Sequence, residues 1–155
     1  MHTIASIAVT LLKAEQPEFK EYAKQIMVNA KALAKGLMDK GATLVTGGTD
    51  NHMLVLDTVK SFGIDGKKAE EVLDQVLITT NKQIIPDDTN PPLKPSGIRI
   101  GTPAATTRGM KEKDMQSLAN WMVSALNSPD DAGLIEGIKS EVKAFCKKFP
   151  PPGVH

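Results

Sequence analysis

Arg99 is the residue whose type and position most directly suggest chemistry. It lies between Ile98 and Ile100 in a segment whose alternation predicts a short strand, with the arginine on the face opposite to the two isoleucines. A guanidinium in that position, beside a long proline-rich stretch, can hold a carboxylate or a phosphate through paired hydrogen bonds. An arginine facing solvent on an edge strand has the same spacing, and the spacing alone favours that second interpretation.

The other candidate residues are interpreted as structural. His52 follows Asp50-Asn51 at the start of a predicted strand, which is typical of a hydrogen-bonded turn. Cys146 lies among apolar positions of a predicted helix without a histidine nearby, which indicates a structural thiol. Gly47-Gly48 lacks the glycine spacing of a phosphate loop, so a turn is expected. No His, Asp and Glu residues have metal-ligand spacing, and no lysine lies in the apolar setting that Schiff-base chemistry requires.

Composition narrows the class of protein. The chain has 155 residues, which suits one domain, and its 19 Lys and Arg nearly balance its 18 Asp and Glu. That balance argues against a nucleic-acid partner. No apolar run approaches the roughly 18 residues of a membrane span, and no secretion signal is recognisable. With a single cysteine excluding an internal disulfide, we expect a cytoplasmic protein that binds neither nucleic acid nor membrane.

Hydrophobic periodicity predicts an α+β domain over residues 1–155, with helices covering a small antiparallel sheet. The stretch from Thr79 to Ser96 carries four prolines, which exclude a helix interior or a central strand, and we expect a binding loop or a lid there. The predicted helices begin near residues 3, 17, 66, 111 and 131, with Asp65 and the 128–130 segment as caps, and the predicted strands are 42–46, 52–57 and 97–102.

The first predicted helix, residues 3–14, is unusually apolar. It carries only one charged residue, Lys13, and its apolar positions occupy most of its surface. Such a helix must be covered by the rest of the domain or by a partner.

Several segments together resemble serine hydroxymethyltransferase. They are residues 45–52 (VTGGTDNH), 96–104 (SGIRIGTPA) and 107–109 (TRG), supported by residues 1–5 (MHTIA), 17–19 (PEF) and 80–82 (TNK). All of them occur in the order and spacing of that family, so the resemblance extends over essentially the whole chain. It concerns only the C-terminal third of the enzyme.

The resemblance implies the C-terminal small domain of a fold-type I pyridoxal phosphate enzyme. The segment 3–14 would then be the connection to the large domain, which we expect this chain to lack. The lysine that binds pyridoxal phosphate lies in a THK-type motif in the family, and no such motif occurs here. We therefore expect no stable binding of either pyridoxal phosphate or tetrahydrofolate by this chain alone, and no activity without the missing large domain.

The resemblance also assigns roles to individual residues. Arg99 matches the arginine that holds the amino-acid carboxylate of serine or glycine. The segment Pro91-Pro92-Leu93 and Gln83 match positions that contact tetrahydrofolate, and Gln83 stands where many bacterial members have asparagine. Asp50-Asn51-His52 is interpreted as a motif that shapes the domain.

Two functions follow as expectations. In the first, the chain is part of an enzyme that transfers the hydroxymethyl carbon of serine to tetrahydrofolate, and its partner is the large domain or a full-length subunit. In the second, it is a non-catalytic binding or assembly module that retains an anion site at Arg99 and pairs with itself, as a homo-oligomer, or with a full-length subunit.

Overall fold

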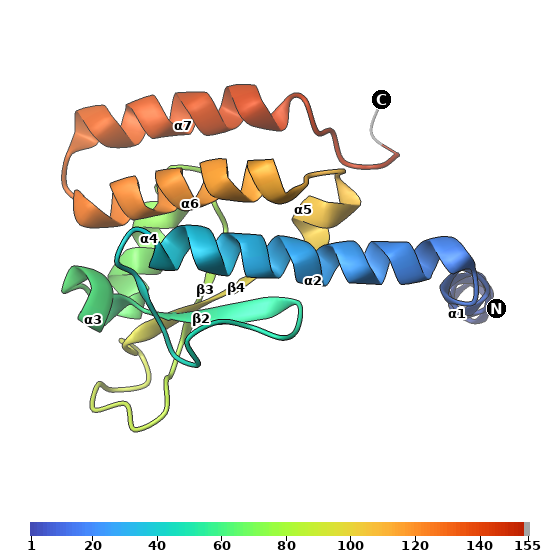
Figure 1. Ribbon diagram of the computed structural model, residues 1–155, viewed down its shortest axis with the longest axis horizontal. Helices are drawn as coiled ribbons and strands as arrows, with labels where there is room; N and C mark the ends of the chain where they lie inside the picture. Colours follow the sequence, from blue (N-terminus) through green and yellow to red (C-terminus); the bar gives the residue numbers. More distant parts are fainter. Residues whose placement is uncertain (154–155) are drawn as a thin grey trace.

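The computed structural model describes residues 1–153, so the last two residues of the predicted 1–155 domain lie outside the described part. Helices pack on one side of a four-stranded antiparallel sheet, which confirms the predicted α+β class (Figure 1). The elements are α1 (His2–Ala14), α2 (Pro17–Met38), β1 (Thr43–Leu44), β2 (Met53–Asp57), α3 (Thr58–Phe62), α4 (Gly66–Gln75), β3 (Asn81–Gln83), β4 (Gly97–Gly101), α5 (Pro103–Thr107), α6 (Glu112–Asn127) and α7 (Ala132–Cys146).

Helix α2 is the central element of the helical layer. It begins at Pro17, whose fixed φ suits the first turn, and its C-terminal half buries Ala30, Leu33 and Leu37 in the core. The chain then turns away at Gly41, which has a φ of +86°, a conformation that glycine adopts without strain. Its N-terminal half extends past the sheet towards α1 (Figure 1).

The strand order is β1-β2-β4-β3, with all neighbours antiparallel. Leu54 and Leu56 of β2 and Ile98 and Ile100 of β4 are buried against the helices. Because side chains alternate along a strand, Arg99 belongs to the opposite face, and it is exposed there. Strand β4 lies between β2 and β3, so the interpretation of Arg99 as an edge-strand residue is wrong.

Three short elements depart from the sequence-based expectation. Strand β3 lies inside the segment 79–96 that was expected to be a loop, and it pairs with β4 at the sheet edge, before the first proline. Helix α3 is five residues long, capped by the Asp57 side chain and ended by Gly63 in the left-handed conformation. Helix α5 is also five residues long, begins at Pro103 directly after β4, and was not predicted.

Two predicted boundaries also need correction. The strand expected at 42–46 contains only Thr43–Leu44, and the next strand begins at Met53. The N-cap of α7 is Asp131, one residue after the predicted 128–130 segment, because its carboxylate accepts the Leu134 backbone N–H. The N-cap predicted at Asp65 is confirmed, since its side chain accepts the Lys68 N–H.

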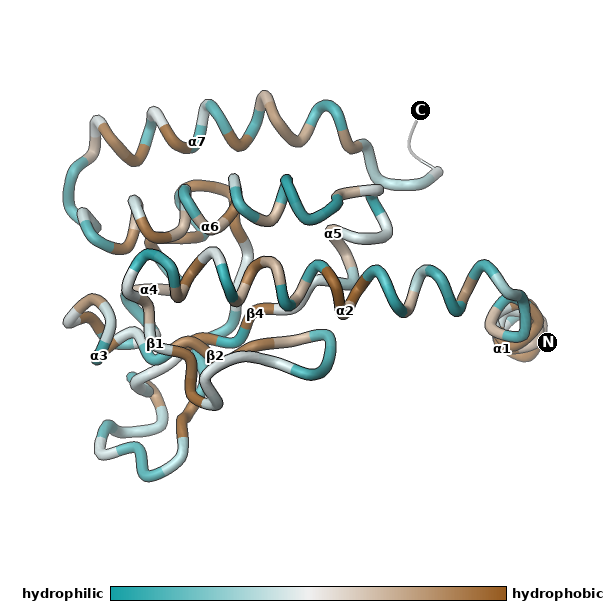
Figure 2. The backbone as a smooth tube through the Cα atoms, viewed as in Figure 1, coloured by the Kyte–Doolittle hydropathy of each residue, from teal (hydrophilic) through white to brown (hydrophobic). Residues whose placement is uncertain are grey.

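Helix α1 is confirmed, and within residues 1–153 it buries no side chain. Ile4, Leu11 and Leu12 are more than 60% exposed, and Figure 2 shows the helix as a largely hydrophobic end of the molecule. No helix among the described residues combines the length and hydropathy needed to cross a bilayer.

Candidate functional site

Arg99 occupies the middle of β4 on the face of the sheet opposite to the core. Its direct neighbours across the sheet are Val55 on β2 and Asn81 on β3. Within residues 1–153 no hydrogen bond or ion pair engages its guanidinium, which is exposed to solvent. The donor fork is therefore free to hold a planar anion.

A buried polar network fixes the C-terminal end of β4. The Thr102 hydroxyl donates to the Ile26 carbonyl of α2 at 2.9 Å, and the Thr102 N–H donates to the His52 carbonyl at 3.0 Å. The Thr106 hydroxyl donates back to the Thr102 carbonyl at 2.8 Å. These bonds tie the strand that carries Arg99 to α2 and to the start of β2.

Asn29 completes this network and is fully buried. Its Nδ2 donates to the Thr106 hydroxyl and to the Met110 carbonyl, each at 2.9 Å, and its Oδ1 accepts from Gln25 Nε2 at 3.0 Å. Reasoning from the sequence missed Asn29. Its position three residues after Ile26 and four before Leu33, on the apolar stripe of α2, was the available signal.

The N-terminal end of β4 is held by close backbone packing. The Ser96 carbonyl accepts from the Thr58 N–H at 2.9 Å and from the Thr58 hydroxyl at 3.0 Å. The Gly66 N–H donates to the Pro95 carbonyl at 2.6 Å, and a Cβ at Gly66 would lie 2.1 Å from the Gly97 carbonyl oxygen. Only glycine at position 66 permits this approach.

Asp88 organises the loop that precedes β4, and it was also missed. Its carboxylate accepts from the Ser96 hydroxyl at 2.7 Å, the Ser96 N–H at 2.9 Å, the Asn90 N–H at 3.0 Å and the Ile85 N–H at 3.3 Å. These donors, with the Ser96 hydroxyl foremost, lower the pKa of Asp88 to about 2. The proline-rich loop is therefore closed on itself by one carboxylate.

The predicted folate residues occupy two different places. Gln83 ends β3 opposite Gly97, on the same face as Arg99, and its Nε2 donates to the Ile84 carbonyl at 3.0 Å. Pro91, Pro92 and Leu93 lie in the loop that projects from the sheet edge (Figure 1), and Leu93 is 79% exposed. The structure thus places Gln83 diagonally across from Arg99, while the proline segment stands apart from the sheet.

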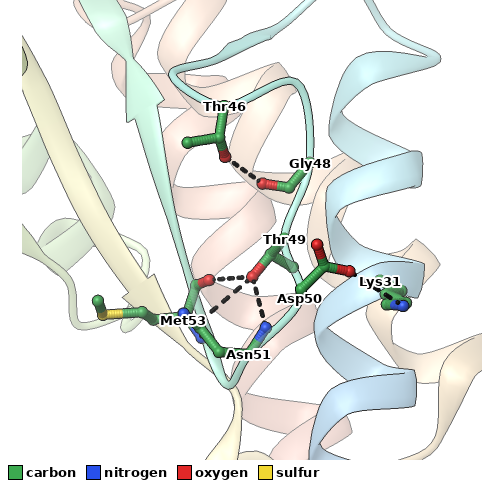
Figure 3. A network of polar contacts seen from close by, with 7 residues as sticks. All are labelled: Lys31, Thr46, Gly48, Thr49, Asp50, Asn51 and Met53. Atoms are coloured by element: carbon green, nitrogen blue, oxygen red, sulfur yellow. Dashed lines mark hydrogen bonds and ion pairs between the residues drawn. The ribbon is translucent and has the colours of Figure 1, made fainter.

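The segment around His52 has the geometry expected of a structural turn. The Thr49 hydroxyl donates to the Met53 carbonyl, the Asn51 Oδ1 accepts the Met53 N–H at 2.9 Å, and Lys31 pairs with Asp50 at 3.3 Å (Figure 3). Residues 45–51 and 53–55 line an open hollow of about 550 Å³. Gly47-Gly48 forms a turn with φ values of +67° and +154°, as expected.

The remaining groups offer no second site in the described part of the chain. Cys146 is half-buried against the core, and its carbonyl accepts from Arg108 Nη2 at 3.2 Å. Residues 1–153 contain no group of three His, Cys, Asp or Glu side chains suited to a metal ion. Every lysine among these residues is exposed or half-exposed, so none of them fits the enclosed Schiff-base position that pyridoxal phosphate needs.

Comparison with known proteins identifies the family. The family model for serine hydroxymethyltransferase matches residues 1–122. A serine hydroxymethyltransferase of Acidobacterium capsulatum is 50% identical over 150 residues, which cover 97% of this chain and 35% of that relative. One of Koribacter versatilis is 45% identical with the same coverage of both chains. The chain thus spans about a third of the length of these relatives, and with four-fifths of its own length matched by the family model, it belongs to the serine hydroxymethyltransferase family.

Proposed function

We propose that this chain provides the substrate-carboxylate site of a serine hydroxymethyltransferase, which exchanges a one-carbon unit between serine and tetrahydrofolate. The observation that carries the proposal is the placement of Arg99. Its guanidinium is exposed and without a protein partner in the described residues, yet its strand is central and held at both ends. A free cation on a rigid strand is suited to orient a ligand.

In this proposal Arg99 binds the carboxylate of serine or glycine through two parallel N–H···O bonds. Its role is orientation, because a fixed carboxylate determines how the remaining bonds of the α-carbon are presented to the reacting groups. Gln83, on the same face, and the segment Pro91-Pro92-Leu93 contact the tetrahydrofolate. Asp88 keeps that segment in place by closing the loop around Ser96.

Pyridoxal phosphate, the cofactor of the family, supplies an electron sink for the substrate when it is bound. The lysines of residues 1–153 are all at the surface, so they do not fit its Schiff-base position. We therefore assign the cofactor lysine to the part of the family sequence that this chain does not span. Cofactor and substrate would meet where that part approaches the open face of the sheet.

A graft tests this function. The matching 150-residue segment of the Acidobacterium capsulatum relative is replaced by this chain, and tetrahydrofolate-dependent conversion of serine to glycine is measured. We expect turnover by the graft and none by the isolated chain incubated with pyridoxal phosphate. A folded graft that binds the cofactor but cannot convert serine contradicts the proposal, as does turnover by the isolated chain.

Helix α1 favours a second candidate function, that of a non-catalytic assembly module. Ile4, Ile7 and Leu11 lie on one side of the helix and are each more than half exposed. Apolar surface of this kind marks an interaction site. Sedimentation of the isolated chain distinguishes the two functions, because an assembly module forms oligomers at high concentration whereas a monomer there contradicts it.

A further inference from the structure

On the edge strand β3, the residue directly opposite Arg99 is Asn81. The pairing of β3 with β4 sets Asn81 against Arg99, and the two residues project from the same face. Cβ atoms of directly opposed residues lie about 5 Å apart, so both side chains reach a ligand of a few atoms above the sheet. Asn81 is exposed, and within residues 1–153 its side-chain amide makes no hydrogen bond.

The two neighbours of Arg99 differ in chemistry. On strand β2, Val55 is half-buried and offers only methyl groups. On the edge strand β3, Asn81 offers a side-chain amide with two N–H donors. A carboxylate held by the arginine fork retains lone pairs on both oxygens, so a neutral donor on one side adds a hydrogen bond without adding charge.

The lysine of β3, Lys82, forms an ion pair away from Arg99. Lys82 follows Asn81 and therefore points to the other face of the strand. Its Nζ pairs with Glu70 of α4 at 3.0 Å, and its backbone N–H donates to the same carboxylate at 3.2 Å. This contact also fixes β3 to α4, which holds Asn81 at a constant position beside Arg99.

We propose that Asn81 is a second carboxylate-binding residue, whose Nδ2 donates to one oxygen of the carboxylate held by Arg99. This inference rests on the proposed function, since it deepens the same site. The pair Arg99–Asn81 recognises a planar anion with two separated acceptors and discriminates against a spherical anion such as chloride. The ligand is an α-carboxylate, presented over the outer edge of the sheet.

The test is a titration of the 155-residue chain in which chloride is exchanged for acetate at constant ionic strength. The NMR signals of the Arg99 Nε–H and the Asn81 Nδ2 protons report the two contacts, and acetamide serves as the uncharged comparison. We expect acetate, and not acetamide, to shift both signals with one common affinity. Asn81→Ala should weaken acetate binding at Arg99 by about three- to tenfold, the net value of one ordinary hydrogen bond.

Asn81→Asp should weaken binding further, because the new carboxylate repels acetate and pairs with Arg99 itself. Asn120, exposed on α6, provides matched controls. Asn120→Ala and Asn120→Asp make the same chemical changes on the helical layer and should leave acetate binding unchanged. Backbone amide signals of the buried Leu56 and Ile98 verify that each variant is folded.

The outcomes separate the two proposals. If acetate shifts the Arg99 signal and Asn81→Ala binds as the wild-type chain does, Asn81 is not a ligand, while the proposed function stands. If the Arg99 Nε–H signal has the same position in acetate as in chloride, the carboxylate site itself is refuted. The inference about Asn81 is then refuted as well.

Discussion

Replacing Asn29 by alanine should destabilise the fold more than any single loss of a surface polar group. The side chain is fully buried, and the substitution removes two hydrogen bonds donated to Thr106 and Met110 and one accepted from Gln25. At about 1 kcal/mol for each bond, with the Met110 carbonyl left without that donor, the loss is about 3 kcal/mol. For a chain of this size it corresponds to a fall in Tm of about 6–12 °C.

The assay is urea unfolding followed by far-UV circular dichroism and by the fluorescence of Trp121, the only tryptophan. Trp121 reports packing of α6 against α7, because its ring lies 5.1 Å from that of Phe145. A double-mutant cycle between Asn29→Ala and Thr106→Val should give a coupling energy of about 1 kcal/mol. Asn120→Ala, exposed on α6, is the matched control and should change the free energy of unfolding by less than about 0.5 kcal/mol.

The reasoning is refuted if Asn29→Ala loses no more stability than Asn120→Ala. It is also refuted if the cycle shows no coupling, because the Asn29–Thr106 hydrogen bond would then contribute nothing to the link between α2 and α5.

Two further predictions concern the contacts that hold the N-terminal end of β4. Asp88 has a folded-state pKa of about 2, below its ordinary value of 3.8, so its carboxylate stabilises the fold above pH 4 and that contribution is lost as the pH falls towards 2. Urea midpoints between pH 2 and 5 should therefore depend less on pH in Asp88→Asn, and an unchanged pH profile would count against the loop closure. Gly66→Ala places a Cβ 2.1 Å from the Gly97 carbonyl oxygen and should lower Tm sharply or prevent folding. Gly137→Ala, in open space on α7, should instead raise stability by about 0.5–1 kcal/mol, and equal effects at the two glycines would contradict the close packing.

The long helices could be predicted because their signals are local. Helix α2 has a proline at its start, a regular apolar stripe and a glycine after its end, and each of these lies within the helix or beside it. The short elements could not be predicted in this way. Strand β3 has three residues, and its conformation depends on pairing with β4, whose partner residues are 14 or more positions away.

In the candidate site too, features with a local sequence signal could be predicted, and features that depend on distant residues could not. The face of Arg99 followed from the alternation of Ile98 and Ile100, but the central position of its strand depends on the order of all four strands, which no local pattern contains. Asp88 receives its donors from a loop closed over eight residues, so its role was invisible in the sequence. The roles of Gln83 and of Pro91-Pro92-Leu93 stay predictions from the family resemblance.

The central claim is that Arg99 holds the substrate carboxylate, and serine affinity of the grafted enzyme tests it most directly. Arg99→Lys keeps the charge but loses the two-pronged donor, and we expect the Kd for serine to rise by at least about tenfold. Arg108→Lys is the matched control. Arg108 donates from Nε to the Phe149 carbonyl at 2.6 Å and so anchors the end of α7, and its replacement should reduce stability and leave the Kd for serine unchanged. A Kd for serine that is the same in Arg99→Lys as in the unsubstituted graft would contradict the account.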